Sequence, residues 1–258
     1  MKIVVLMKEV PDTYGDRKLD VATGLADRAA SEAVPDEINE RALEVALHYA
    51  DQNDAVEVTL LSMAPADATA TIRKGLAMGA HSAVHVVDDA LRGADMGLTA
   101  LVLSTAITQR GFDLVIAGNR STDGASGMLP AMIAERLDVP SLTSLNDVEI
   151  GAAQITGQRS SDGATLVVTA ALPAVISVTE SLPDARFPNF KGIMAAKKKP
   201  IETVTIESLT LSSDEHTTPR SIVIAAREKP ARTAGIKVVD TGDAGRQLAD
   251  FLVQNRLV

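Results

Sequence analysis

The sequence predicts an α/β protein with a doubly wound, mainly parallel sheet, added antiparallel strands and an extended C-terminal arm. Up to Pro140, short apolar runs alternate with helical patterns, a rhythm typical of a parallel sheet covered by helices. After Pro140, strand patterns follow one another without helices between them. From residue 181 the chain is mostly polar and irregular until an amphipathic pattern near its end.

Short apolar runs rich in β-branched residues mark the strands of the parallel sheet. Continuous apolar character, as in residues 2–7, is expected of a strand that is buried on both faces. Helical patterns between the runs predict the βαβ connections of a doubly wound sheet. The predicted parallel strands occupy residues 2–7, 56–63, 83–87 and 114–117.

Apolar residues spaced three or four apart mark the helices. The first helix opens at residues 35–37, where Asp36 is a candidate N-cap and acidic residues of the first turn suit the helix dipole. Its buried stripe consists of Leu43, Ala46, Leu47 and Ala50. Further helices are predicted over residues 67–78, 98–107 and 126–137.

The second half of the chain follows a different pattern. We interpret its first strand candidates as antiparallel strands at the edge of the parallel sheet; they occupy residues 142–150, 154–159, 165–170 and 174–178. Residues 200–235 are mostly polar, with one strand-like stretch at 222–226. The last segment ends in an amphipathic helix that is too small to fold alone, so its apolar stripe needs a partner surface. That stripe consists of Leu248, Phe251, Leu252 and Asn255.

Composition excludes several classes of function. The 258 residues include no cysteine, which excludes disulfides, Cys-ligated zinc or iron–sulfur clusters and thiol catalysis. A net charge of −9 and the scarcity of aromatic residues disfavour nucleic acid as a partner. His81 and His85 flank a strand pattern, where residues four apart lie ~13 Å from each other, too far for one metal ion. No apolar run reaches the ~18–20 residues of a membrane span and the N-terminal run is too short for a signal sequence, so we expect a cytoplasmic protein without membrane insertion.

The loop at residues 117–127 is the first candidate site. It follows a predicted parallel strand, and ligands of open α/β sheets bind at the carboxyl ends of strands. Its glycines allow close backbone approach, while Ser, Thr and free N–H groups at a helix start suit a phosphate. The loop matches neither a Walker A loop, nor Gly-x-Gly-x-x-Gly, nor a nucleophile elbow. A plain βα turn before a capped helix is the alternative.

Two other regions are candidates. Residues 61–65, residues 6–8 and Asp36 could line one cleft, with ordinary loop chemistry as the alternative. Residues 186–199 combine an aromatic pair, Pro and Gly with a cluster of lysines, which is unusual in an acidic protein so poor in aromatics. This segment is typical of a docking loop with an apolar anchor inside a basic collar. Alternatively, its Phe side chains pack inward and its lysines are solvated.

These three regions together resemble the beta subunit of electron transfer flavoproteins, and the resemblance covers essentially the whole chain. The most specific match is residues 190–202, Phe-Lys-Gly-Ile-Met-Ala-Ala-Lys-Lys-Lys-Pro-Ile-Glu. Residues 232–237 resemble the entry to the family's C-terminal arm. Further matches lie at residues 7–11, 36–44, 72–80 and 117–124.

The resemblance implies a heterodimer, with an adenine nucleotide alpha-hydrolase-like fold in this chain. The alpha subunit would carry the redox-active FAD, and this chain would bind AMP in a structural role. It would be an electron carrier subunit without catalytic or metal-binding residues of its own. The heterodimer would accept electrons from acyl-CoA dehydrogenases and related dehydrogenases, as in fatty acid β-oxidation. It would pass them through electron transfer flavoprotein-quinone oxidoreductase toward the respiratory chain.

Carried over by position, the resemblance also implies two sets of site residues. The AMP site would comprise Leu6, Asp36, Glu37, Ile38, Asn39, Met63, Gly118, Asn119, Arg120, Ser121, Thr122, Asp123, Gly124, Ala125, Ser126, Gly127, Met128 and Leu129. Asp36 stands where the family has Asn, and we expect its carboxylate to face the ribose or adenine because it would repel a phosphate. The recognition segment, residues 186–195, would insert as a loop into the dehydrogenase, with Phe190 as anchor. Its binding residues would be Arg186, Phe187, Pro188, Asn189, Phe190, Lys191, Ile193 and Met194.

The resemblance divides the chain into three parts. Residues 1–185 would form the nucleotide-binding domain, residues 186–235 the recognition segment and a linker, and residues 236–258 an arm that docks on the alpha subunit. Two alternatives stay open. The chain could be a bifurcating-type beta subunit that holds a second FAD instead of AMP. It could also be a stand-alone adenine-nucleotide-binding protein, because the scaffold resembles nucleotide alpha-hydrolases and universal stress proteins.

Overall fold

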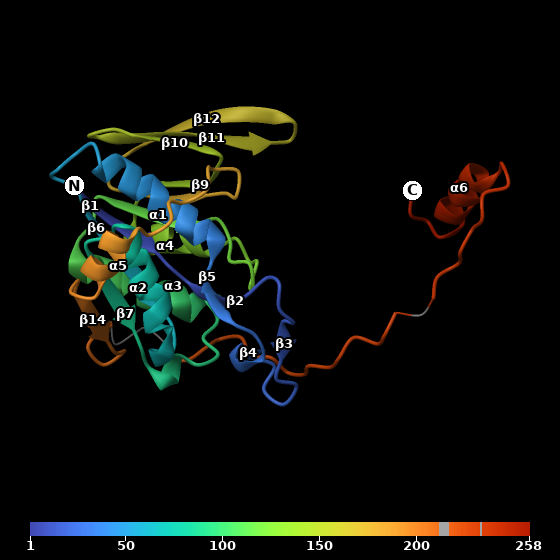
Figure 1. Cartoon of the computed structure of the whole chain (residues 1–258), viewed down its shortest axis with the longest axis horizontal. Coiled ribbons are helices and arrows are strands. Elements are labelled where there is room, and N and C mark those ends of the chain that lie inside the picture. The colour runs from blue at the N-terminus through green and yellow to red at the C-terminus, as the bar shows by residue number, and fades with distance from the viewer. Residues whose placement is uncertain (212–216, 233) are drawn as a thin grey trace. The chain divides into compact units, whose positions relative to one another are not determined.

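The computed structural model describes residues 1–211, 217–232 and 234–258 (Figure 1). Two compact units can be distinguished by their internal contacts, Met1–Ala226 and Arg227–Val258. The strand-like stretch predicted at 222–226 lies in the first unit. Residue 233, within the predicted entry to the arm, and residues 212–216, within the predicted linker, lie outside the described residues.

A seven-stranded parallel sheet forms the centre of the first unit. Its strand order is β14-β7-β6-β1-β8-β13-β9, with β1 in the middle. Val4 of β1 pairs with Thr59 of β6 on one side and with Val115 of β8 on the other. The strands are β1 (Lys2–Leu6), β6 (Glu57–Met63), β7 (Ser82–Val86), β8 (Leu114–Gly118), β9 (Ser141–Leu145), β13 (Ala174–Val178) and β14 (Ile201–Val204).

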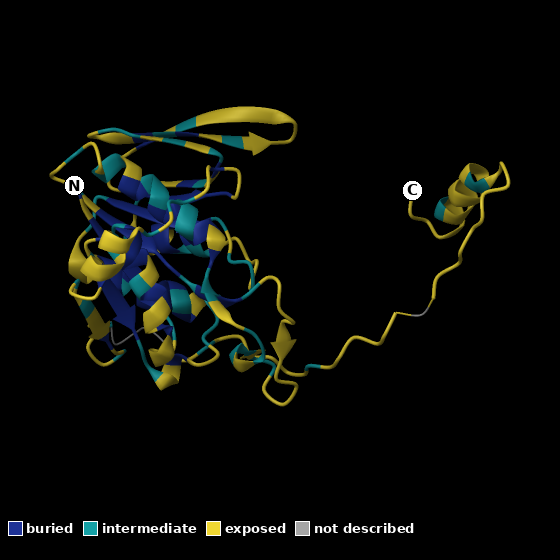
Figure 2. Ribbon diagram, viewed as in Figure 1, coloured by how far each residue is buried: buried dark blue, intermediate teal, exposed yellow. Residues whose placement is uncertain are grey.

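Helices cover both faces of this sheet, which confirms the predicted doubly wound fold. In β1, Ile3 and Val5 face a core shared with α1 and α2, whereas Val4 and Leu6 face a second core shared with α3 and α4. Figure 2 shows that the buried residues, in dark blue, are concentrated in the central strands and in the helices that cover them. The helices of the first unit are α1 (Glu37–Ala50), α2 (Thr69–Met78), α3 (Met96–Arg110), α4 (Leu129–Leu137) and α5 (Phe190–Ala196), with short 3-10 turns η1 (Arg28–Ala30), η2 (Ala66–Ala68) and η3 (Asp89–Leu91).

Helix α4 begins three residues later than the predicted start at residue 126. Ala125 and Gly127 have φ angles of 51° and 69°, which lie in the left-handed region and cannot continue a right-handed helix. Pro130 stands in the first turn of α4, where its missing N–H costs nothing. The loop between β8 and α4 is therefore longer than the sequence pattern predicts.

The strands after Pro140 correct the prediction of four antiparallel edge strands. Only the middle of this region forms an antiparallel sheet, made of β10 (Asp147–Ile150), β11 (Gln154–Ser161) and β12 (Ala164–Ala171). Strands β9 and β13 instead join the parallel sheet, with β13 inserted between β8 and β9. All five residues of β13 are buried, as expected of a strand with neighbours on both sides and helices on both faces.

The polar region after residue 181 also differs from the prediction. Strand β14 pairs with β7 at the sheet edge, and α5 precedes it, although the sequence predicted neither. The strand predicted at residues 222–226 is wrong: this stretch forms no strand, and the side chain of Ile224 is 94% exposed. Apolar character alone is therefore misleading here, because these residues are exposed and no strand of the described structure pairs with them.

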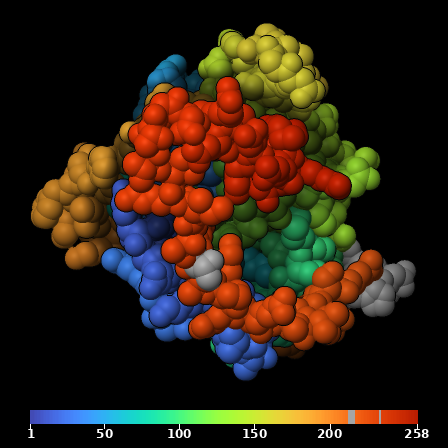
Figure 3. All heavy atoms as spheres, turned by 90° about the vertical axis from the view of Figure 1, so that its right-hand side faces the viewer, coloured from blue at the N-terminus to red at the C-terminus, as the bar shows by residue number. Residues whose placement is uncertain are grey.

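A long excursion between β1 and α1 adds two small antiparallel pairs to the fold. They are β2 (Glu9–Pro11) with β5 (Ala33–Pro35), and β3 (Lys18–Leu19) with β4 (Ala26–Asp27). The Val223 side chain packs against Gly24 of this excursion, so the segment before Ala226 crosses it (Figure 3). The backbone amides of Arg220 and Ser221 donate to the Asp95 carboxylate at 2.8 Å and fix the same segment.

The second unit contains α6 (Ala244–Gln254), which confirms the predicted amphipathic helix. None of its residues is buried within the described unit, and Leu248 and Phe251 of the apolar stripe are exposed. Among the described residues, no helix is long and apolar enough to cross a membrane.

Candidate functional site

The candidate site lies where the strand order of the parallel sheet reverses. From β1 the chain proceeds to β6 and β7 on one side, whereas β8 and β13 lie on the other. In open α/β sheets, ligands bind outside the carboxyl ends of the strands at such a switch point. Three predicted segments meet here: the end of β1, the first turn of α1, and the loop 119–128 that follows β8.

The fully buried Asp36 joins α1 to that loop. Its Oδ1 accepts hydrogen bonds from the backbone amides of Ile38 at 3.0 Å and Asn39 at 3.4 Å, as an N-cap does. Its Oδ2 accepts from the backbone amide of Thr122 at 2.7 Å. Both carboxylate oxygens are thus bound by the protein itself, and Asp36 holds the loop in place.

Gly118 lets the first turn of α1 approach the end of β8. A Cβ atom at this position would lie 2.5 Å from Nδ2 of Asn39 and 3.0 Å from Cγ2 of Ile38. Asn39 is buried, and its Oδ1 accepts from the backbone amide of Lys8 at 2.8 Å. The end of β1, the start of α1 and the loop after β8 are therefore held together by hydrogen bonds between backbone amides and side chains, without a ligand.

An ion pair closes the other side of the loop. Lys8 Nζ lies 2.7 Å from Oδ1 of Asp123 and 3.2 Å from Oγ of Ser121. The Gly124 amide donates to Asp123 Oδ1 at 2.6 Å. Burial by itself raises the pKa of Asp123, but the hydrogen bond and the charge of Lys8 outweigh it, so this pKa lies below its usual value.

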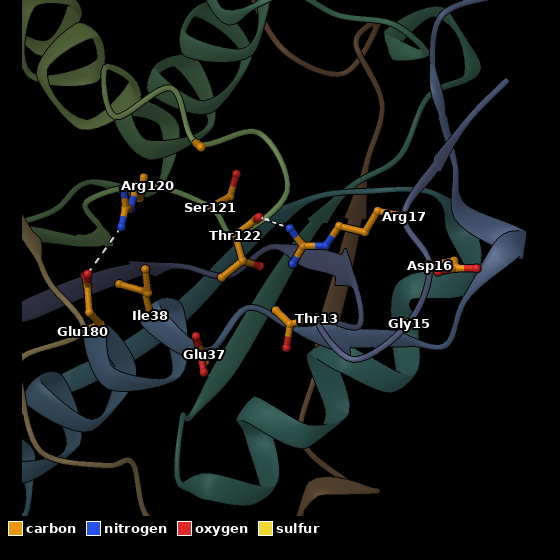
Figure 4. Close-up of a pocket in the computed structure, with 11 residues that line it drawn as sticks. Thr13, Gly15, Asp16, Arg17, Glu37, Ile38, Arg120, Ser121, Thr122 and Glu180 are labelled. Atoms are coloured by element: carbon orange, nitrogen blue, oxygen red, sulfur yellow. Dashed lines mark hydrogen bonds and ion pairs between the residues drawn. The ribbon is translucent and has the colours of Figure 1, made fainter. Parts of the chain in front are cut away.

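A cavity of about 570 Å³ opens beside the loop (Figure 4). Arg17 reaches across from the excursion and donates to the Thr122 carbonyl oxygen, while Arg120 lies 3.4 Å from the Glu180 carboxylate. Of the predicted site residues, Glu37, Ile38, Arg120, Ser121, Thr122 and Ala125 line this cavity. The sequence analysis missed Thr13, Gly15, Asp16, Arg17 and Glu180.

Signals for some of these missed residues exist in the sequence. Glu180 follows β13, and a parallel assignment of that apolar run would have placed Glu180 at the same sheet edge as the loop after β8. The excursion carries no motif that predicts its return to the site.

Some polar groups near the cavity have no partner in the part of the chain that the structure describes. Oδ1 of Asn119 and Oγ1 of Thr122 are buried and without a hydrogen bond. Among the described residues, none accepts from the backbone amides of Ser126, Gly127 and Met128, just before α4. Free amides at a helix start favour an anion, and a polar ligand at this position would give the orphaned side chains a partner.

The remaining predicted residues have supporting positions. Leu6 is buried in the core between β1 and the α3 face, and Met63 packs against the same core. Gly124 and Asp123 take part in the ion-paired turn, Met128 is exposed, and Leu129 begins α4.

The recognition segment is only partly a loop, because its second half forms α5. Asn189 is the N-cap of this helix and accepts from the Gly192 amide at 2.8 Å. Phe187 is 91% and Phe190 80% exposed, so the alternative in which both side chains pack inward is not what the structure shows. Ile193 and Met194 are exposed beside them, whereas Arg186 is bound by carboxylates of α1.

The histidines of the predicted strand region have structural partners. His81 Nδ1 accepts from the Val58 amide at 3.0 Å, and His85 is buried with Nε2 3.1 Å from the Ala64 carbonyl oxygen. Within the described residues, no group of three or more His, Asp or Glu side chains could hold a metal ion.

Comparison with known proteins gives one consistent family. A family model described as the electron transfer flavoprotein domain matches residues 23–209. The chain is 48% identical to the electron transfer flavoprotein subunit beta of Mycobacterium tuberculosis and 45% identical to that of Mycobacterium leprae, each over 99% of both chains. It is also 32% identical to a subunit of the caffeyl-CoA reductase-Etf complex of Acetobacterium woodii, over 98% of this chain and 97% of that protein.

Removal of the Asp36 carboxylate should destabilise the protein. We expect Asp36→Ala to lower the free energy of unfolding by about 2–3 kcal/mol, because it removes an N-cap and leaves the Thr122 amide without its acceptor. Asp36→Asn keeps an oxygen for the N-cap but cannot accept both sets of bonds, so its loss should be smaller. Urea denaturation measures both variants. Equal stability of Asp36→Asn and Asp36→Ala would contradict the double role.

The Lys8–Asp123 pair should stabilise the loop in a pH-dependent way. The pKa of Asp123 is lower in the folded protein than in the unfolded chain, where it is about 4. The pair therefore adds fully to the free energy of unfolding above about pH 4. This stabilisation is lost as the pH falls through the pKa that Asp123 has in the folded protein. The free energies of unfolding of wild type and Asp123→Asn, measured with urea, should differ at pH 7, and the difference should shrink as the pH falls below about 4. A difference that stays constant over this range would show that the charge of Asp123 is not involved.

Proposed function

This chain belongs to the electron transfer flavoprotein family as a beta subunit, and from that premise we propose that it binds AMP, supports an FAD held mainly by the alpha subunit, and docks dehydrogenases. Its role is electron transfer with a flavin alongside an alpha subunit. The finer assignments below rest on the geometry of the chain. The observation that carries the docking role is the outward exposure of Phe187 and Phe190 in a chain so poor in aromatics.

AMP fits the cavity beside loop 119–128. The free amides of residues 126–128 would donate to its phosphate, and Arg17 adds a positive charge nearby. The orphaned polar atoms of Asn119 and Thr122 would gain partners from the same nucleotide. The expectation that Asp36 faces the ribose or adenine is not kept in this proposal: both of its oxygens accept from backbone amides of the protein, so Asp36 positions the loop.

The chain has no cysteine and therefore no thiol for redox chemistry. FAD would supply the redox chemistry when it is bound. Within this proposal the chain shapes and supports that site, and its own side chains perform no covalent step. The excursion between β1 and α1, which carries the exposed Tyr14, lines the same cavity as loop 119–128. The second unit, with the exposed apolar stripe of α6, would cover part of the alpha subunit.

The recognition segment would dock acyl-CoA dehydrogenases and related dehydrogenases. Phe187, Phe190, Ile193 and Met194 form an exposed apolar group, and the exposed Lys191, Lys197 and Lys198 surround it. An apolar anchor supplies contact area, while a basic collar attracts an acidic partner surface and speeds encounter. Reduced flavin would then pass electrons toward electron transfer flavoprotein-quinone oxidoreductase.

Bound nucleotides of the purified heterodimer test the cofactor assignment. After co-expression with the alpha subunit and acid release, we expect one AMP and one FAD per heterodimer. Two FAD and no AMP would instead support a bifurcating-type beta subunit. A chain that stays monomeric and is active without an alpha subunit would support the stand-alone nucleotide-binding alternative.

The anchor role of Phe190 can be tested by truncation. We expect Phe190→Ala to slow reduction of the heterodimer by a dehydrogenase about tenfold or more, because an exposed aromatic anchor contributes more than 1 kcal/mol to docking. FAD content should stay at the wild-type level. Val167→Ala, which truncates an exposed apolar residue on β12, is the matched control. Wild-type kinetics for Phe190→Ala would refute the assignment.

A further inference from the structure

Helices α2 and α5 cap each other at their carboxyl ends. The Lys199 Nζ atom donates to the carbonyl oxygens of Leu76 at 2.9 Å, Gly79 at 3.2 Å and Ala80 at 2.6 Å, at the end of α2. In the other direction, Arg73 of α2 caps the end of α5: its Nη1 atom lies 2.6 Å from the Ala196 carbonyl oxygen and 2.7 Å from the Lys199 carbonyl oxygen. The last carbonyl groups of a helix have no partner within it, and a cation there is favourable.

Lys199 therefore differs from the two lysines before it. Lys197 and Lys198 are exposed, whereas Lys199 is half-buried and, among the described residues, its Nζ is bound only by carbonyl oxygens. Desolvation lowers the pKa of Lys199, as expected for an ammonium group that is partly removed from water. Of the three consecutive lysines, only the third is built into the fold.

Close backbone contact completes the interface between the two helices. A Cβ atom at Gly192 would lie 2.3 Å from the Ala77 carbonyl oxygen, so only glycine allows this approach. Ala196, one turn further along α5, is buried. The face of α5 toward α2 thus carries small residues, and Phe190 and Met194 are left exposed.

The amino-terminal side of the recognition segment is fixed independently. The Arg186 guanidinium makes two hydrogen bonds of 2.8 Å to the Glu44 carboxylate and one of 2.8 Å to Asp51, both on or next to α1. The Arg186 backbone amide adds a bond of 3.0 Å to Glu44. The exposed apolar side chains therefore lie between two anchored ends.

We propose that Lys199 and Arg73 are positioning residues of the docking surface: their reciprocal capping holds α5 against α2 and presents Phe190, Ile193 and Met194 in a fixed arrangement. The proposal rests on the docking function proposed above. A helix of seven residues is not stable in isolation, so α5 depends on these contacts. Because a preformed surface loses less conformational entropy on association, the capping should act on affinity and leave the electron transfer step itself unchanged.

The experiment compares Lys199→Met with Lys198→Met in the purified heterodimer. Both variants lose one positive charge of the same cluster, but only Lys199→Met removes the cap of α2. We expect Lys199→Met to raise the KM for the heterodimer as dehydrogenase substrate roughly five- to tenfold, with kcat little changed. Amide hydrogen exchange should show lost protection in α5 for Lys199→Met alone. Lys199→Arg keeps a cationic donor, so its KM and its protection of α5 should both lie between those of wild type and Lys199→Met.

The outcomes separate this inference from the docking proposal. Wild-type protection of α5 in Lys199→Met would overturn the positioning role whatever the kinetics. Lost protection with an unchanged KM would also overturn it if Phe190→Ala does slow reduction. If α5 loses protection in Lys199→Met but neither Lys199→Met nor Phe190→Ala affects reduction by the dehydrogenase, the docking function itself is refuted. The positioning role is then refuted with it. Equal effects of Lys198→Met and Lys199→Met on KM would show that only the charge matters.

Discussion

The candidate site depends on how closely the first turn of α1 approaches the end of β8. This approach requires the absence of a side chain at Gly118, and it places the buried carboxylate of Asp36 between two elements that are far apart in the sequence. Three backbone amides satisfy that carboxylate, so a buried charge that would otherwise be costly becomes a structural bond. The loop after β8 is thus positioned before any ligand arrives.

Chain connectivity explains why these residues meet at one place. Strand β1 lies at the centre of the sheet, and the chain leaves it toward one edge before it returns to the other. Segments that follow β1, β8 and β13 consequently share one end of the sheet. The excursion after β1 adds Arg17, which reaches the loop from the opposite side of the cavity. Hydrogen bonds between backbone amides and the side chains of Asp36 and Asn39 hold these segments together.

The sequence predicts those elements best whose burial leaves a local pattern of apolar residues. Continuous apolar runs predicted β1, β6, β7 and β8, and Asp36 was predicted as the N-cap of α1. Strand β13 has the same apolar character, but its neighbours in the sequence form an antiparallel sheet, and its place beside β8 is a tertiary contact that no local pattern contains. Helix α5 was missed for a related reason. Its capping by Arg73 and the space that Gly192 provides depend on α2, more than 100 residues earlier.

The two faces of α5 differ in how tightly the fold constrains them, and this difference affects how the protein can diversify. Gly192 lies against the backbone of α2 and Ala196 is buried, whereas Phe190 and Met194 are exposed. Substitutions on the outer face should therefore be nearly neutral for folding. Under the docking proposal, related chains could carry different outer side chains on α5 and still keep the same scaffold.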